Sequence, residues 1–159
     1  ESMRAIAADL RPAVLDLGLV AAIEWQMQEF HRRTGIAYEL MNDEDEIPLD
    51  NDRATAVFRI LQESLTNIIR HAQASRIEVQ VSRSSDFLNL RIADNGIGIA
   101  ENTLKKSRSF GIAGMRERVR LLDGSMKISS RAGHGTNIKI SIPLREQRDQ
   151  EQIWHPGEE

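Results

Sequence analysis

The spacing of the apolar residues changes abruptly in the middle of the chain. From residue 51 to about residue 71 they recur every three or four positions, which is the helical period. In 77–81 apolar and polar residues alternate, and the same alternation returns in 88–92 and in 138–142. Strands in which apolar and polar residues alternate have one buried face and one solvent-exposed face, which is typical of antiparallel sheets. The chain is therefore predicted to combine helices with a sheet that is covered on one face.

Helix caps and turn residues place the remaining elements. The segment 19–34 has apolar residues at helical spacing and is followed by Gly35, a typical C-terminal cap. A strand is expected at 36–40, Asp50 is expected to cap the long helix, and 111–122 is predicted to be another helix. This order predicts an α/β (α+β) two-layer sandwich, with a mixed, largely antiparallel sheet of about five strands and three helices on one face.

Composition excludes several classes of protein. The 159 residues suit a single core, and 40% hydrophobic with 28% charged residues are values of a globular chain rather than a disordered one. The chain has no cysteine, which excludes disulfides and cysteine-based zinc sites. No apolar run reaches the roughly 18 residues needed to cross a membrane, and the net charge of −3 does not favour nucleic acid. We therefore expect no direct nucleic-acid binding and no membrane contact by this segment.

The long helix separates polar from apolar residues when it is drawn as a wheel. Asn67, Arg70 and His71 fall near Glu63 on one side. The opposite side is apolar and consists of Val57, Phe58, Leu61, Leu65, Ile68 and Ile69. One side is predicted to pack and the other to present functional groups, although a polar stripe that only faces solvent would show the same pattern.

A glycine-rich turn follows the strand at 88–93. Gly96 and Gly98 would let a ligand approach the backbone, and Asp94 could accept a hydrogen bond from an exocyclic amine. An ordinary β-turn would use the same residues. The third glycine of a dinucleotide-binding fingerprint is absent, and no phosphate-binding loop with a Gly-Lys-Ser/Thr ending occurs, so the two common nucleotide motifs are excluded.

Two further glycine pairs lie nearer the C-terminus. Gly111 and Gly114 open the predicted third helix, whose N-terminus favours phosphate, and the basic segment 105–108 precedes them. A flexible surface loop before an ordinary helix is the alternative interpretation. The stretch 133–136, which ends at Thr136, would by itself predict a hairpin turn.

Taken in this order, the four stretches resemble a known set of motifs. Residues 63–72, 94–98, 110–115 and 133–136 are similar to the N box, G1 box, G2 box and final Gly-Thr motif of the ATP-binding superfamily of histidine kinases, type II topoisomerases and mismatch-repair ATPases. The stretch 111–124 and the Leu-Arg-Pro…Leu-Asp-Leu-Gly-Leu sequence at 10–19 resemble the nitrate-sensor-like sensor histidine kinases. The resemblance implies the end of a dimerisation helix and a connector at 1–17, an ATP-binding catalytic domain at 18–144, and a polar tail at 145–159.

The resemblance also implies roles for individual residues. Asp94 would accept a hydrogen bond from the adenine amino group, and Thr136 would support the adenine through water. Asn67 would bind Mg²⁺, and Glu63 would position Mg²⁺ or water, which makes these two residues the expected catalytic and metal-binding pair. ATP and Mg²⁺ are the expected cofactors.

The remaining expected ATP-binding residues surround the phosphates and the backbone of the motifs. Arg70 and His71 would lie near the phosphates, and Gly111 and Gly114 would allow a lid to close around them. Gly96 and Gly98 belong to the same expected site through the G1 box.

The implied activity is transfer of the γ-phosphoryl group of ATP to a histidine on the dimerisation domain, for relay to a response regulator. No His precedes Pro12 and the sequence begins at Glu1, so we expect a fragment without the phosphoacceptor histidine. The fragment is expected to be a monomeric cytoplasmic domain of a homodimeric parent, which leaves a membrane anchor elsewhere in the parent open.

Two other functions share part of this pattern. A serine kinase of the anti-sigma-factor type would carry the same boxes but not the Leu-Arg-Pro…Leu-Gly-Leu connector. A non-catalytic module would bind ATP only to signal to a partner, yet every matched position here is chemically competent. A topoisomerase or mismatch-repair ATPase is the poorest fit, because those proteins need transducer domains that this chain lacks.

Overall fold

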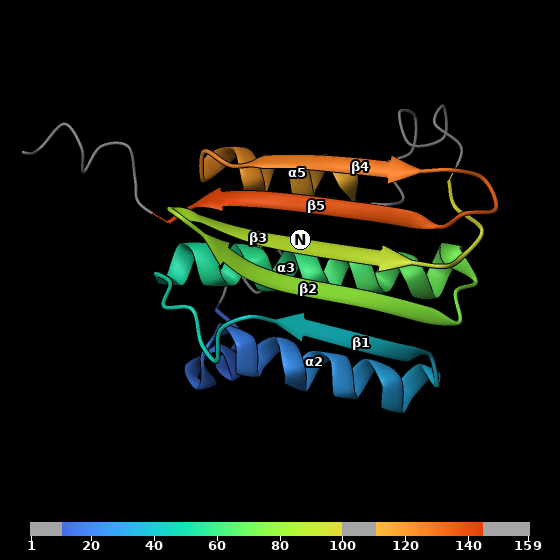
Figure 1. The fold of residues 1–159 in the computed structure, drawn as a ribbon, viewed down its shortest axis with the longest axis horizontal. Helices are drawn as coiled ribbons and strands as arrows, with labels where there is room; N and C mark the ends of the chain where they lie inside the picture. The colour runs from blue at the N-terminus through green and yellow to red at the C-terminus, as the bar shows by residue number, and fades with distance from the viewer. Residues whose placement is uncertain (1–10, 100–110, 145–159) are drawn as a thin grey trace, which may run out of the picture.

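The structure, a computed structural model, describes residues 11–99 and 111–144. These residues form two layers, in which helices cover one face of a five-stranded sheet (Figure 1). The predicted two-layer sandwich is therefore confirmed. The elements in chain order are a 3₁₀ helix η1 (Ala13–Leu17), α2 (Leu19–Thr34), β1 (Ala37–Asn42), α3 (Asn51–Asn67), a π-helical turn η2 (Ile68–Ala72), β2 (Arg76–Ser84), β3 (Phe87–Asp94), α5 (Ile112–Leu121), β4 (Ser125–Ser130) and β5 (Thr136–Pro143).

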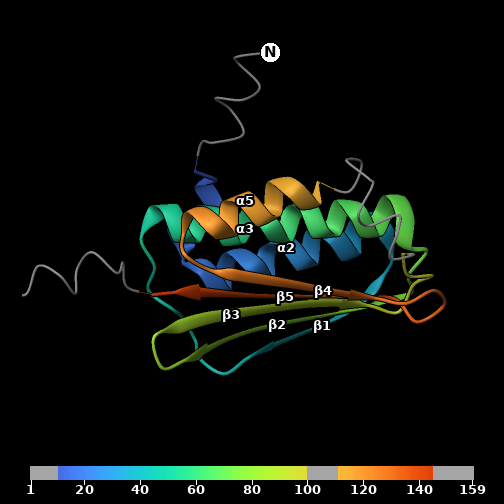
Figure 2. The ribbon, with the colours of Figure 1, turned by 90° about the horizontal axis from the view of Figure 1, so that it is seen from above.

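The sheet is mixed, as predicted. Its strand order is β1-β2-β3-β5-β4, with β1 parallel to β2 and the other neighbours antiparallel. The parallel pair requires a crossover, because a hairpin can join only antiparallel strands, and α3 provides it. Figure 2 shows the consequence: α2, α3 and α5 all lie on the same side of the sheet.

The core lies between the helices and the sheet. Alternate residues of the three strands expected from the sequence point into it, and Val79, Ile92 and Ile140 are each at most 3% exposed. On the helical side, Phe58 and Leu61 of α3 are completely or almost completely buried. The period-2 pattern and the helical pattern thus supply the two halves of a single core.

The helix ends follow the predicted caps. Gly35 adopts a positive φ of 73°, and its N–H donates to the carbonyl of His31 at 2.8 Å. The Asp50 carboxylate accepts from the N–H of Arg53 at 3.3 Å and caps α3. The prediction that Ile69 packs in the core is wrong. Its side chain is 57% exposed, because it lies at the margin of the apolar side of the long helix.

The segment expected to be a plain connector has structure of its own. Ala13–Leu17 forms η1, and Leu15 is buried in the same core as α2 and α3. The side chain of Glu46 lies against Gly18 and accepts from the N–H of Val20 at 2.9 Å, at the start of α2. The segment 13–17 therefore packs against the same core as the helices that follow it.

Three expectations fall outside the described residues: the helix end before Leu10, the polar segment at 101–110, and the tail after Leu144. Within the ranges that the structure describes, no helix has both the length and the apolar character needed to cross a bilayer.

A buried arginine joins the start of α3 to the end of β5. The Arg53 side chain is 6% exposed, its Nε donates to the carbonyl of Pro143 at 2.6 Å, and its Nη1 donates to the Asp50 carboxylate at 2.9 Å. A buried guanidinium is tolerated only when its donors are satisfied. These contacts bring the C-terminal end of the sheet against the first turn of the central helix.

We expect Arg53→Ala to lower the free energy of unfolding by about 2 kcal/mol, because the substitution leaves two acceptors without their donor. Chemical denaturation checks this, with Arg33→Ala, the loss of an exposed arginine on α2, as the control. Burial acts to raise the pKa of Asp50, but the hydrogen bonds and charge of Arg53 outweigh it and lower that pKa. Part of the wild-type advantage should therefore be present at neutral pH and disappear as pH falls through the lowered pKa. Equal stability of the two variants at pH 7 would contradict the prediction.

Candidate functional site

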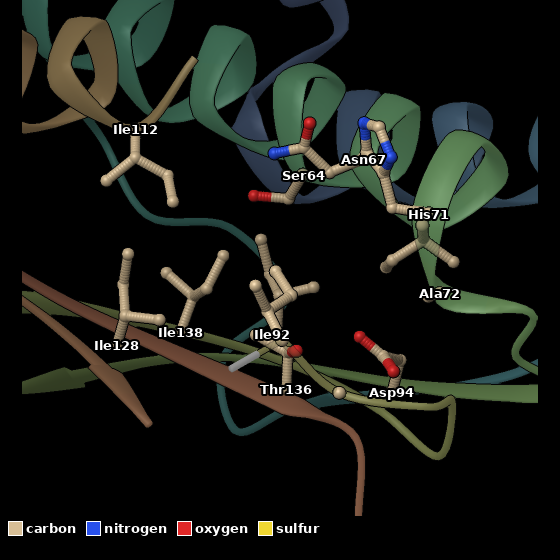
Figure 3. Close-up of a pocket in the computed structure, with 13 residues that line it drawn as sticks. Ser64, Asn67, His71, Ala72, Ile92, Asp94, Ile112, Ile128, Thr136 and Ile138 are labelled. Carbon is tan, nitrogen blue, oxygen red and sulfur yellow. The ribbon is translucent and has the colours of Figure 1, made fainter. Parts of the chain in front are cut away.

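A narrow pocket opens between α3 and the sheet. Its polar lining comes from Ser64, Asn67 and His71 on the helical side and from Asp94 and Thr136 on the sheet side (Figure 3). The apolar part of the lining consists of Ile68, Ala72, Ile92, Ile99, Ile112, Ile128 and Ile138. The volume is only about 30 Å³, so a planar ring could enter only if these side chains moved apart.

The structure brings half of the expected site residues to this pocket. The residues that line it are Asn67, His71, Asp94, Gly98 and Thr136. The expected residues that do not line it are Glu63, Arg70, Gly96, Gly111 and Gly114. The first group includes the aspartate and the asparagine that were expected at opposite ends of one ligand, and they approach the pocket from different layers.

Asp94 is the acidic group of the pocket and stands at the end of β3. Its Oδ1 accepts from the N–H of Gly96 at 2.8 Å, and the N–H of Thr136 also donates to the carboxylate. Burial raises the pKa of Asp94, and the two backbone donors only partly counteract that effect. The folded chain thus keeps a partly desolvated carboxylate directed into a mainly apolar pocket, where an additional donor would stabilise it.

The loop after Asp94 is attached to the end of η2. The N–H of Ile97 donates to the carbonyl of Ala72 at 2.8 Å, and Asn95 Oδ1 accepts from the N–H groups of Ser75 and Arg76. A Cβ on Gly96 would lie 2.1 Å from the carbonyl oxygen of Ala72. The close packing of this loop on η2 is therefore sufficient to require glycine at position 96.

Gly98 and Gly135 have the same kind of role on the other side of the loop. Gly98 has a φ of 72°, and a Cβ there would lie 2.1 Å from the carbonyl oxygen of Arg131. A Cβ on Gly135 would lie 2.0 Å from the carbonyl oxygen of Asp94. The loop at 95–99 and the β4–β5 turn thus pack backbone against backbone, which positions Asp94 beside Thr136.

Two serines of the site were missed by the sequence reasoning. Ser130 Oγ accepts from the N–H of Ile99 at 2.6 Å and lies 2.9 Å from Thr136 Oγ1, so it connects the loop to β5. Ser64 is 1% exposed and donates to the carbonyl of Ile60 at 2.8 Å while it lines the pocket. A signal for Ser64 existed, because it precedes Asn67 by three residues and therefore shares its helix face.

The remaining expected residues lie at the margin of the site. Glu63 is exposed near the start of α5, where a Cβ on Gly111 would lie 2.7 Å from its Oε2. Arg70 is exposed on η2, and Gly114 faces open space on α5. In the part of the chain with described positions, no three His, Asp or Glu side chains gather into a metal site.

Comparisons with known proteins identify the family and the fold. Residues 52–146 match the family model described as histidine kinase-, DNA gyrase B-, and HSP90-like ATPase. The chain is 38% identical over 140 residues to the signal transduction histidine-protein kinase/phosphatase DegS of Bacillus subtilis, covering 84% of this chain and 36% of DegS. It is 30% identical over 145 residues to the oxygen sensor histidine kinase NreB of Staphylococcus carnosus, covering 91% of this chain and 42% of NreB. The chain thus spans well under half of these relatives.

Solved structures show the same fold. The histidine kinase domain of a blue-light activated histidine kinase from Erythrobacter litoralis EL346 superposes with a TM-score of 0.65 at 22% identity, over 87% of this chain and 66% of that one. The catalytic domain of histidine kinase ThkA superposes with a TM-score of 0.66 at 16% identity, over 79% of this chain and 90% of that one.

The raised pKa of Asp94 leads to a stability prediction. Between its ordinary pKa and its raised value, the folded protein holds a proton that the unfolded chain has released, so wild-type stability falls as pH rises through that interval. We expect Asp94→Asn, which keeps an acceptor oxygen for both backbone donors, to have a larger free energy of unfolding than wild type at pH 7. The gain should shrink as pH falls. Denaturation between pH 4 and pH 8 measures it, with the surface variant Asp86→Asn as control; a gain equal to the control's at every pH would refute the prediction.

Proposed function

Because the chain belongs to the family of histidine kinase-, DNA gyrase B- and HSP90-like ATPases, we propose that it binds ATP in the pocket between α3 and the sheet and serves as the catalytic domain of a two-component sensor histidine kinase. One observation carries the proposal: Asp94 and Asn67 line the same pocket from opposite layers. Figure 3 shows the carboxyl group of Asp94 on the sheet side and the amide of Asn67 on the helix side.

The adenine end of the nucleotide is assigned to Asp94. Its carboxylate would accept a hydrogen bond from the exocyclic amino group, and a bond to a charged acceptor is stronger than one between neutral groups. Ile92 and Ile138 would contact the apolar faces of the ring. Thr136, beside Asp94, would support the ring through water. Because the pocket is narrow, binding requires the isoleucine side chains to separate around the purine.

The phosphate end is assigned to the last turns of α3 and the first turn of α5. Asn67 offers an amide oxygen, the kind of ligand that Mg²⁺ prefers, and Mg²⁺ commonly keeps several waters and phosphate oxygens as its other ligands. The exposed Glu63 would position one of those waters. His71 and Arg70 would lie beside the phosphates. Backbone N–H groups at Gly111 and Gly114 would face the same anion at the start of α5.

ATP with Mg²⁺ supplies the phosphoryl group and neutralises part of its charge. The protein contributes position, since phosphoryl transfer depends largely on alignment and electrostatic stabilisation. The acceptor is a histidine imidazole: its nitrogen forms a bond to the γ-phosphorus as the bond to the bridging oxygen breaks, and ADP leaves. We assign that histidine to a dimerisation domain of the same parent protein, and the next acceptor to a response regulator.

This assignment is supported by what the chain resembles outside the pocket. DegS and NreB are named as histidine kinases, and their similarity extends over 84% and 91% of this chain. It therefore includes much of the sequence N-terminal to the ATPase match at 52–146. In our proposal the chain acts in the cytoplasm, as one catalytic domain of a homodimeric parent.

Adenine recognition is tested by Asp94→Ala. We expect the substitution to weaken ATP binding by about 1.5–3 kcal/mol, or roughly 10- to 150-fold, because it removes a charged hydrogen-bond acceptor. Isothermal titration calorimetry with wild type, Asp94→Ala and Asp86→Ala makes the comparison, since Asp86 lies in the exposed β2–β3 turn. Unchanged affinity of Asp94→Ala would place Asp94 outside the nucleotide site.

Metal binding is tested by Asn67→Ala. We expect roughly ten-fold weaker ATP binding in Mg²⁺, the size expected for one lost ligating group, but little change in EDTA. Asn51→Ala, at the exposed first residue of the same helix, is the matched control. Similar losses in Mg²⁺ and in EDTA would show that Asn67 acts on the nucleotide without the metal.

The same proteins test the transfer step. With radiolabelled ATP, wild type and Asn51→Ala should label the histidine of a supplied dimerisation domain, and Asn67→Ala should label it far more slowly. ATP binding by wild type without any transfer to a matched dimerisation domain would favour the non-catalytic module instead.

A further inference from the structure

The sheet has a second face that no described helix covers. Figure 2 shows α2, α3 and α5 on one side only. On the other side a groove of about 620 Å³ runs over β2, β3, β5 and β4. Its lining includes the outward-pointing residues Arg91, Lys139 and Lys127, together with the polar side chains Ser82, Asn89 and Ser141.

The three cations lie in one cross-strand row. Arg91 of β3 is directly opposite Lys139 of β5, and Lys139 is directly opposite Lys127 of β4. Like charges at directly opposed positions destabilise a sheet. Arg91 lies 3.4 Å from Glu78, but the ion pairs found within 11–99 and 111–144 include neither lysine. The pairing of the two lysines therefore costs folding energy without a described compensation.

A purely structural role explains only part of this row. Lys127 lies on the edge strand β4, where a lysine commonly prevents pairing with a foreign strand. Lys139 lies on the interior strand β5, where edge protection is not needed. The chain as a whole carries a net charge of −3, so the row is a local concentration of positive charge on an acidic protein.

The dimensions of the row suit an acidic polypeptide. Neighbouring strands are about 4.8 Å apart, so the row extends roughly 10 Å across the sheet. Alternate residues of an extended chain are about 6.8 Å apart on one side, which lets two carboxylates reach the row together. The hydroxyl and amide groups beside the row can hydrogen-bond to a peptide backbone. Nucleic acid presents phosphates along a longer path, so binding it would require a longer row of cations and a protein with less net negative charge.

We propose that this groove binds an acidic segment of a partner protein. The binding surface is separate from the nucleotide pocket, which lies between the sheet and α3 on the covered face. The inference therefore does not depend on the proposed kinase activity, and each can fail without the other.

The test uses a short synthetic peptide of alternating glutamate and alanine, and its glutamine–alanine counterpart as a neutral probe. We expect the protein to bind only the acidic peptide at about 50 mM salt, and its affinity for that peptide to fall as the salt concentration is raised. Lys127→Gln/Lys139→Gln should bind about ten-fold more weakly, the combined effect of two exposed ion pairs. Arg33→Gln/Arg120→Gln, which removes the same charge from α2 and α5, should bind like wild type.

Three further measurements decide the occupant. The lysine variant should keep wild-type ATP affinity and melt at the same or a higher temperature, because cross-strand repulsion has been removed. A lower melting temperature would assign the lysines to folding and overturn the proposal. Tighter binding of a single-stranded oligonucleotide than of the acidic peptide would also overturn it.

Sedimentation at the same salt covers the remaining alternative. Salt-dependent self-association that Lys127→Gln/Lys139→Gln abolishes would mean that the acidic loop Asp43–Asp45 of a second copy occupies the groove. That result would replace the partner protein with a homodimer. If the lysine variant and the arginine control weakened binding of the acidic peptide equally, only net charge would matter, and binding in the groove would be refuted.

Discussion

The hydrogen bond between the N–H of Ile97 and the carbonyl of Ala72 joins the two layers at the end where the candidate site lies. One partner belongs to the loop that follows β3, and the other closes the π-helical end of the central helix. Gly96 packs directly under this contact, and Gly135 packs under Asp94 from the other side. Because these approaches are between backbones, the carboxylate of Asp94 is held in place by groups that cannot change rotamer.

The central helix makes this arrangement possible. It connects two parallel strands, so it must cross the sheet, and its apolar side is used for that packing. Ser64, Asn67 and His71, which share one edge of the helix and its π-helical extension, are left beside the pocket. Single π-helical turns frequently occur at functional sites. Here the turn carries His71 and ends at the carbonyl that accepts from Ile97.

The layers and the main site residues could be predicted from sequence because they depend on local patterns. The change of period separated helix from sheet, and the caps at Gly35 and Asp50 have short-range causes. The reasons for the glycines could not be predicted in the same way. A glycine indicates that space or a positive φ is needed, but the neighbour that needs the space at Gly96 is Ala72, 24 positions earlier in the chain. Only the folded backbone shows that this neighbour belongs to the protein and is no ligand.

Two other differences have equally specific causes. Ser130 contributes through hydrogen bonds to a loop more than 30 positions away, and a serine in an alternating strand gives no sign of such a partner. The helix η1 is five residues long, too short to show a period, and Pro12 and Gly18 on either side resemble the ends of a loop. In each case the decisive contact is long-range, whereas sequence patterns report mainly on neighbours.

The junction at Glu46 has a mechanical consequence. Leu15 is buried in the core, and the Glu46 carboxylate accepts a hydrogen bond from the first turn of α2. The segment from Ala13 to Val20 is therefore fixed to the helical layer at two points. A movement of the chain at Pro12 would therefore be passed to α2 through these packing contacts as well as along the backbone.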